Sequence, residues 1–366
     1  MPENPLASST LKLRTIATWY GIRVLAWDGN VLYGCRGYEI VRLNAHPEID
    51  RTAEWEVVAR FRPTWWRGLT ARTNLGYRLV RDGFHALTIL HSQTSGERDD
   101  VMMVGAVPGA LVTWSRDSDQ FRVTHRVRRG TRPLHVTAVP SGKIYWGEYF
   151  DNRERAEVHI YGSGDRGCTW QIAYTFPRGS IRHVHNIVYD RSGDCLWIIT
   201  GDEGAECKIL RADCNLGSVE VVLSGSQQTR AAAAIPTEHG LYFSTDTPSE
   251  KNNVYRLDRS GSIEKVGQLS SSSIYGCGVG RAMFFSTMVE PSAENKSREV
   301  QIAGSRGGAD WQVVARWKKD RWPMRYFQYG NAFLPDGENS TRCLAATTVA
   351  VETDDLATTI WEVESP

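Results

Sequence analysis

Residues 180–190, SIRHVHNIVYD, place one arginine and two histidines within four positions, directly before an apolar run. Arg182, His183 and His185 offer a guanidinium group, which binds carboxylates in pairs of hydrogen bonds, and two imidazoles, which exchange protons near neutral pH. Taken alone, the segment is equally explained by a strand whose first polar side chains face solvent or bond to a neighbouring strand. It becomes a candidate site only if other segments of the same kind converge on it, which depends on the fold.

The composition is that of a globular chain and gives no sign of a nucleic-acid or membrane partner. Of 366 residues, 41% are hydrophobic and 23% charged, and 43 lysines and arginines nearly balance 42 aspartates and glutamates. A net charge of +1 creates no field that attracts either partner, and no apolar run approaches the length of a membrane span. The 13 tryptophans and 33 glycines favour a turn-rich β protein.

The N-terminus and the cysteines both suggest a cytoplasmic protein. The first ten residues, MPENPLASST, have neither the basic region nor the apolar stretch of a secretory signal. The seven cysteines form no CxxC pair, and an odd number cannot all pair within one chain. We therefore expect a reducing, cytoplasmic location.

A short motif recurs along the chain with a period near 47 residues. Residues 161–170, YGSGDRGCTW, carry the pattern S-x-D-x-G-x-T-W, which ends at Trp170. In such a turn the aspartate and serine bond backbone N–H groups, the glycine takes a positive φ, and the tryptophan begins the next strand. Degraded copies read AGSRGGADW at 303–311 and WSRDSDQF at 114–121, and Trp311 lies 141 residues, three times 47, after Trp170. Self-similarity at this period in a β-rich chain indicates a β-propeller.

The intact copy of the motif resembles the Asp-box, or BNR repeat, of the sialidase-like β-propeller superfamily. The resemblance implies the fold and a structural turn at Asp165. It implies little about activity, because Asp-boxes occur in hydrolases, lyases and non-catalytic propellers alike and lie away from the active face. Sialidases themselves are a poor match, since their N-terminal arginine motif is only distantly similar to YGIRVL at 20–25. We therefore expect the fold of the superfamily and not its best-known substrate.

Recurring pairs of apolar runs predict an all-β chain, with one propeller domain over residues 1–366. Examples are HVTAVPSGKIYWGEY and HNIVYDRSGDCLWIITGD. The last blade lacks a fourth strand, so we expect the N-terminal strand at 11–17 to join the C-terminal strand at 358–363 and close the ring, which removes an exposed sheet edge. Six blades are the alternative to seven, because the boundaries around 64–100 are loose. Inner strands of seven four-stranded antiparallel blades are expected near residues 22, 76, 135, 185, 231, 275 and 329.

Propeller geometry turns positions along the chain into a predicted site. The first strand of each blade starts on the face where the second strand ends, and ligands bind on that face, where the central channel opens. Ten residues hold such positions: the catalytic candidates are His135, Glu148, Tyr149, His183, His185 and Asp202, and the substrate-binding candidates are Arg23, Arg182, Arg230 and Asp246.

Four of these residues, His135, His185, Glu148 and Asp202, are expected to share one pocket, with the others nearby or on its rim. Arg182 is one residue out of step with the histidines, so its side chain could instead enter the packing between blades. Each aspartate could likewise serve only to cap a turn.

A mouth lined by carboxylates, imidazoles and guanidinium groups suits an acidic, uronate-type oligo- or polysaccharide. In hydrolysis, a carboxyl pair (Glu148 with Asp202, or Asp202 with Asp246) would act as acid and as base or nucleophile. In β-elimination, an arginine or a metal would neutralise the uronate carboxylate, and a histidine or Tyr149 would take the C5 proton. The histidines with Glu148 could also hold calcium or a transition metal, although their spacing is no metal signature.

The competing class is a non-catalytic propeller that binds a glycan or a protein on the same face. The concentration of ionisable groups argues against it, because a protein-binding face is richer in exposed aromatic residues and arginine. Aromatic segments are present, however, as TWWRGL at 64–69 and RWPMRYFQYG at 321–330, so this alternative stays open. A monomer is expected in either case.

Overall fold

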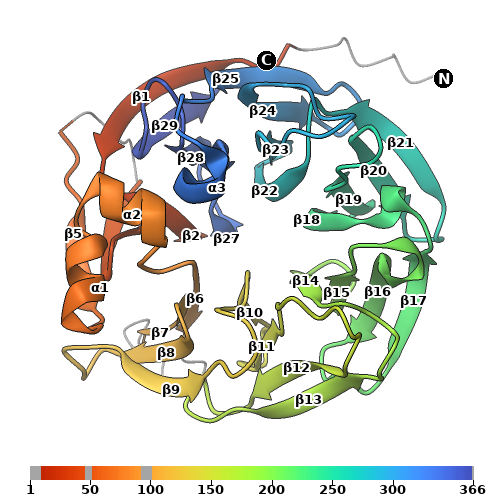
Figure 1. The fold of residues 1–366 in the computed structure, drawn as a ribbon, viewed down its shortest axis with the longest axis horizontal. Helices are drawn as coiled ribbons and strands as arrows, with labels where there is room; N and C mark the ends of the chain where they lie inside the picture. Colours follow the sequence, from red (N-terminus) through yellow and green to blue (C-terminus); the bar gives the residue numbers. More distant parts are fainter. Residues whose placement is uncertain (1–9, 46–51, 92–100, 365–366) are drawn as a thin grey trace, which may run out of the picture.

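Seven β-sheets stand around a central axis like the blades of a propeller (Figure 1). The structure is a computed structural model and describes residues 10–45, 52–91 and 101–364. The chain is therefore all-β and forms seven blades, as predicted, and not the alternative six.

Five blades are meanders of four consecutive antiparallel strands that run from the axis outward. The second strand of each of these blades is largely buried, because each blade packs between two others and both faces of the strand are covered: every residue of β15 and β23 is buried. Outer strands such as β17 and β21 are largely exposed. In chain order the strands of these blades are β6 (Ala86–His91), β7 (Val101–Val107), β8 (Ala110–Ser115) and β9 (Arg122–Arg126); β10 (Thr137–Ala138), β11 (Ile144–Gly147), β12 (Val158–Ser163) and β13 (Gln171–Phe176); β14 (Val184–Asp190), β15 (Cys195–Thr200), β16 (Lys208–Asp213) and β17 (Val219–Ser224); β18 (Ala231–Thr237), β19 (Gly240–Thr245), β20 (Asn253–Asp258) and β21 (Ile263–Gln268); β22 (Ser273–Val279), β23 (Ala282–Thr287), β24 (Glu299–Arg306) and β25 (Gln312–Lys318).

The two ends of the chain complete one blade between them. β1 (Leu13–Tyr20) pairs antiparallel with β29 (Ala357–Val363), with Ala17 opposite Ile360, and β28 (Cys343–Val349) and β26 (Asn331–Phe333) continue the sheet toward the axis. The predicted closure of the ring by the N-terminal strand is confirmed.

The remaining blade contains a strand that the sequence did not reveal. β2 (Arg23–Gly29), β3 (Val31–Arg36), β4 (Glu39–Asn44) and β5 (Glu56–Arg60) form the expected meander. β27 (Asp336–Asn339) adds a fifth strand parallel to β2, on the side of the axis (Figure 1). It comes from the connection between β26 and β28, so the last blade contributes backbone to the channel wall of the first.

One predicted inner strand, that near residue 76, is wrong. Residues there form the helix α2 (Asn74–Val80), which follows α1 (Trp65–Thr70), and the inner strand of that blade is β6. The Thr73 hydroxyl accepts a hydrogen bond from the N–H of Gly76 at 3.1 Å, which caps the helix and favours it over a strand.

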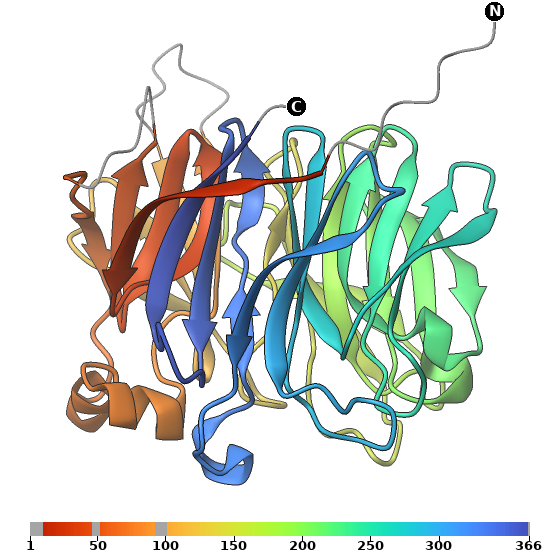
Figure 2. The same ribbon diagram turned by 90° about the horizontal axis from the view of Figure 1, so that it is seen from above.

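All helices of the described residues lie toward one face of the ring. α3 (Met324–Phe327) precedes β26. The 3₁₀ turn η1 (Gly204–Glu206) follows β15, and the 3₁₀ turn η2 (Gln227–Thr229) precedes β18. Figure 2 shows α1, α2 and α3 projecting from the same side of the disc. This is the face on which the inner strands begin. Over the described ranges, no helix has the length and apolar character needed to cross a membrane.

The turn between β12 and β13, on the opposite face, has the geometry that its sequence pattern predicts. Asp165 accepts bonds from the Thr169 N–H at 2.8 Å, the Thr169 hydroxyl at 2.6 Å and the Ser163 hydroxyl at 2.8 Å. Gly167 has φ +86° and donates its N–H to Ser163 Oγ. The indole N–H of Trp170 bonds to a threonine of the preceding blade. The turn therefore holds the outer strand in place and tethers adjacent blades.

Candidate functional site

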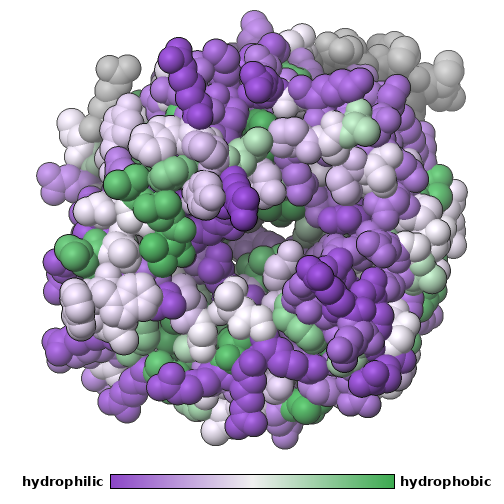
Figure 3. All heavy atoms as spheres, viewed as in Figure 1, coloured by the Kyte–Doolittle hydropathy of each residue, from purple (hydrophilic) through white to green (hydrophobic). Residues whose placement is uncertain are grey.

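A cavity of about 310 Å³ opens where the inner strands begin, and side chains from all seven blades line it. Figure 3 shows the depression at the centre of this face, surrounded mainly by hydrophilic residues. Seven of the ten residues singled out by sequence line it: Arg23, His135, Tyr149, His185, Asp202, Arg230 and Asp246.

Three inner strands have a β-bulge near their first residues, and the bulged residue of each strand lines the cavity. The pairing of the first and second strands shifts by one residue at His185, at Ala232 and at Ile274, and all three of these residues line the cavity. The residue two positions before the bulge is His183, which directly precedes β14, and Arg230, which directly precedes β18. Equivalent positions in neighbouring blades thus supply an imidazole and a guanidinium group to one place.

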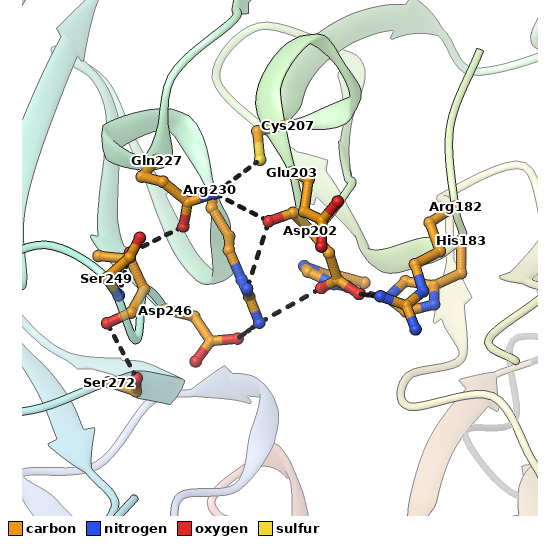
Figure 4. Close-up of polar contacts among 12 residues, drawn as sticks. Arg182, His183, Asp202, Glu203, Cys207, Gln227, Arg230, Asp246, Ser249 and Ser272 are labelled. Carbon is orange, nitrogen blue, oxygen red and sulfur yellow. Dashed lines mark hydrogen bonds and ion pairs between the residues drawn. The ribbon is translucent and has the colours of Figure 1, made fainter. Parts of the chain in front are cut away.

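Asp202, which follows β15, is the centre of the polar cluster (Figure 4). Its carboxylate oxygens lie 3.1 Å from Arg182 Nη1, 3.3 Å from Arg230 Nη2, 3.4 Å from His183 Nε2 and 3.3 Å from His185 Nε2. Burial would raise the pKa of Asp202, but its contacts with the two histidines outweigh the effect of burial and hold the pKa well below its usual range. Asp202 is therefore ionised, and Arg182 points to it and not into the packing between blades.

The two imidazoles are fixed by the backbone. His183 Nδ1 donates to the carbonyl oxygen of Phe150 at 2.9 Å, and His185 Nδ1 donates to that of Ala231 at 2.7 Å. His183 and His185 are each 4% exposed, and burial lowers the pKa of His185. The Nε2 atoms face each other at 2.9 Å beside Asp202. Two imidazole nitrogens and a carboxylate form a donor set that can hold a metal ion.

Arg230 stands between two carboxyl groups. Its Nη2 atom lies 3.3 Å from Asp202 Oδ1 and 3.7 Å from Asp246 Oδ2, so these oxygens are at most about 7 Å apart, with the guanidinium group between them (Figure 4). Burial, together with the charges of Glu290 and Asp202, raises the pKa of Asp246 to about 7. Beside them, burial raises the pKa of Tyr149 to about 12, so its phenol keeps its proton. We call Tyr149, His185, Asp202, Arg230 and Asp246 the proton-exchange wall.

A second group, the arginine wall, lines the cavity from the blades of β2, β6 and β10. It consists of Arg23, Arg81, Arg132 and His85. Arg23 is buried, donates to the carbonyl oxygen of His85 at 3.3 Å and lies 4.0 Å from the ring centre of Phe333. Among the described residues, none of the three arginines makes an ion pair with a carboxylate. Burial and the charge of Arg23 lower the pKa of Arg132 to about 10. Burial, together with the charges of Arg132 and Arg23, keeps the pKa of His85 well below its usual value.

Glu148 does not share the pocket, so this part of the prediction is wrong. Its carboxylate is 3% exposed, accepts a bond from Arg129 Nε at 2.8 Å and another from the N–H of His159 at 2.8 Å. Glu148 and Tyr149 follow β11 and are adjacent, and neighbouring side chains of an extended chain point to opposite sides. Since Tyr149 faces the cavity, Glu148 faces the blade.

His135 lines the cavity but does not join the Asp202 cluster. Its Nδ1 atom lies 3.0 Å from Asp336 Oδ2, on β27. This contact ties the additional strand of the channel to the wall of another blade.

Three members of the arginine wall were missed by sequence reasoning. Arg132 could have been found, because it precedes His135 by three positions as Arg182 precedes His185. Arg81 ends α2 with φ +58°, in a segment that was expected to be a strand. His85 follows the same loop, and no local pattern marks it.

Comparison with known proteins supports the fold alone. No protein-family model and no curated protein matches the chain. Among solved structures, a chain of the mitotic checkpoint complex is similar with TM-score 0.53 and 10% identity, over 100% of this chain and 98% of that one. The Cps50 (Swd1) β-propeller domain of Myceliophteria thermophila is similar with TM-score 0.55 and 13% identity, over 99% and 100%. At such identities the likeness extends to the propeller and not to the site.

Proposed function

We propose that the protein is an enzyme that cleaves an acidic glycan at the cavity by β-elimination beside a uronate carboxylate. One observation carries the proposal: a single cavity of about 310 Å³ is lined both by proton-exchanging groups and by arginines that have no carboxylate partner among the described residues. That volume is at the small end of ligand sites and suits a short part of a sugar chain.

The arginine wall supplies the anion site. Arg23 is buried, its Nε atom has no hydrogen-bond partner within the described part of the chain, and Arg132 lines the same cavity. Guanidinium groups bind carboxylates with paired, charge-assisted hydrogen bonds. A uronate carboxylate held here loses much of its negative charge to its partners, which acidifies the neighbouring C5–H bond.

The proton-exchange wall supplies the base and the acid. Asp246, whose pKa is about 7, is suited to take the C5 proton near neutral pH. The C5–H electron pair then forms the C4–C5 double bond as the C4–O bond breaks. Tyr149, which lines the same cavity, donates its phenolic proton to the departing oxygen. One chain end becomes a 4,5-unsaturated uronate, no water is consumed, and the two residues exchange their protons with solvent.

Hydrolysis by a carboxyl pair fits the geometry less well. A glycosidase places the scissile bond between its two carboxyl groups. Here the Arg230 guanidinium occupies the space between Asp202 and Asp246. Asp202 also has its oxygens engaged by two arginines and two histidines, which weakens it as a nucleophile.

A second candidate function is protein binding on the same face. Aromatic side chains are exposed there on α1 and around α3: Trp65 is 82% exposed, Trp322 51% and Tyr326 58%. Aromatic residues and arginine are enriched at interface centres. One of the similar propellers belongs to a protein assembly, the mitotic checkpoint complex.

The test is a panel of uronate-containing and neutral oligo- and polysaccharides, followed by the ultraviolet absorbance of the unsaturated uronate and by mass spectrometry of the products. We expect unsaturated products from at least one acidic glycan, and their loss in Asp246→Asn. His239→Ala, at an exposed turn, is the matched control. Saturated products would show that the protein hydrolyses the glycan and would contradict elimination. Binding without any product would favour the binding propeller.

A further inference from the structure

Three donor atoms converge where β14 begins and β15 ends, with the spacing of ligands around one ion. His183 Nε2 and His185 Nε2 are 2.9 Å apart; Asp202 Oδ2 lies 3.4 Å from His183 Nε2, and Asp202 Oδ1 lies 3.3 Å from His185 Nε2. Ligands about 2.0–2.1 Å from an ion lie about 3.0 Å apart at a right angle and about 3.4 Å apart at the tetrahedral angle. The separation of the two nitrogens and the distance from each nitrogen to one carboxylate oxygen agree with this range to about 0.1 Å, and ligand atoms from all three residues lie within 4.8 Å of one another.

The tautomers of both histidines are set for ligation. The carbonyl oxygens of Phe150 and Ala231 can only accept hydrogen bonds, so each Nδ1 carries the hydrogen. In the neutral rings the Nε2 lone pairs therefore point at each other and at Asp202. Backbone carbonyls that hold the second ring nitrogen are the usual support of histidine ligands in metal sites.

Two lone pairs at 2.9 Å repel each other unless a positive charge lies between them. A metal ion removes the repulsion, and so does a single proton shared by His183 and His185. The carboxylate of Asp202, within 3.4 Å of both atoms, stabilises either positive charge, and for a metal ion it also supplies a third ligand.

The surrounding charges admit a cation. Arg182 and Arg230 are the neighbouring positive groups, and each also pairs with a second carboxylate, Asp151 at 2.5 Å and Asp246 at 3.7 Å. Above about pH 7, where Asp246 is ionised as well, three carboxylates, counting Asp202, against two guanidinium groups leave a net charge of −1.

We infer that His183, His185 and Asp202 bind one divalent transition-metal ion at the edge of the cavity. Two imidazoles and one carboxylate suit zinc, manganese, iron, cobalt or nickel. Because His185 and Asp202 line the cavity, the remaining coordination positions open toward it, where water or a substrate oxygen would bind. A part for the ion in turnover rests on the proposed function, but its binding does not.

The experiment measures metal without substrate. The full chain, freed of any purification tag and of metal by a chelator, is titrated with Zn²⁺ and then with Mn²⁺, and bound metal and the thermal unfolding midpoint are recorded. We expect one equivalent of zinc and a raised midpoint for the wild type. His185→Ala and Asp202→Asn should weaken zinc binding by at least about tenfold, whereas His135→Ala, another histidine of the cavity, should bind as the wild type does.

If the variants do not fold, the wild type itself still tests the site. X-ray absorption of its zinc complex should show two imidazole ligands. No zinc binding by the wild type, equal binding by His185→Ala, or a spectrum without two imidazoles would overturn the site. Zinc binding without turnover of any glycan would support the metal site and count against the proposed function. Elimination by a protein that binds no metal would support the proposed function and overturn the metal site.

Discussion

The guanidinium group of Arg230 lies 3.7 Å from the carboxyl group of Asp246, yet this arginine does not keep Asp246 ionised below neutral pH. Asp246 is 9% exposed, and Arg230 also serves Asp202 at 3.3 Å. Burial, with Glu290 and Asp202 nearby, raises the pKa of Asp246 to about 7 from 3.8. The folded protein therefore holds a proton that the unfolded chain has released between about pH 4 and pH 7.

This difference predicts how stability depends on pH. Asp246 should destabilise the fold progressively as the pH rises from about 4 to about 7, by roughly 1.4 kcal/mol for each pH unit, with no further change above pH 7. Asp246→Asn does not titrate, so its unfolding midpoint should rise relative to that of the wild type across this interval. Calorimetry of both proteins at matched pH checks it. A constant difference between pH 4 and pH 7 would contradict the raised pKa.

Asp165 should matter for stability and not for turnover. Asp165→Ala removes bonds to the Thr169 N–H and to two hydroxyls, and because the two bonds to Thr169 are exposed and only that to Ser163 is partly buried, the loss should be about 1 kcal/mol in all. Denaturant unfolding should show the loss, while kcat/KM of the folded protein stays unchanged, because the turn lies on the face opposite the cavity. Asp310→Ala, in the degraded copy of the motif, is the exposed control. Lost turnover at normal stability would reverse the assignment.

Glu148 should likewise be structural. Glu148→Gln weakens a buried, charge-assisted contact with Arg129 and leaves that arginine without its carboxylate partner, which we expect to cost about 3 kcal/mol or less, since Arg129 is partly exposed. Turnover per folded molecule should be retained. Chemical denaturation and single-turnover rates separate the two effects. A stable variant without turnover would place Glu148 in the chemistry.

Arg132 should govern the affinity for anionic ligands. Arg132→Gln removes a cation that has no carboxylate partner among the described residues, so the dissociation constant of a free uronate should rise by about tenfold or more. Isothermal titration at two salt concentrations measures it. Arg128→Gln, on the exposed stretch just before this segment, is the control. Equal affinity in both variants would remove the arginine wall from ligand binding.

The sequence alone was sufficient for the ring. The period near 47 residues, three of which separate Trp170 from Trp311, the pairs of apolar runs and the missing last strand predicted seven blades and their closure by the N-terminal strand. Such features are local or periodic, and each blade repeats the same packing problem. The rule that first strands start where second strands end also brought His185, Asp202 and Arg230 to one cavity.

Tertiary structure decided what local patterns do not encode. The bulge at His185 and the change of side between Glu148 and Tyr149 depend on backbone pairing within the blade. Asp336 reaches His135 across 201 residues because β27 joins another blade, and Arg81 reaches the cavity because a capped helix replaces a strand. These positions depend on contacts between segments that are far apart in the sequence. No single segment makes these contacts by itself, so the side chains reach these positions only when the ring closes.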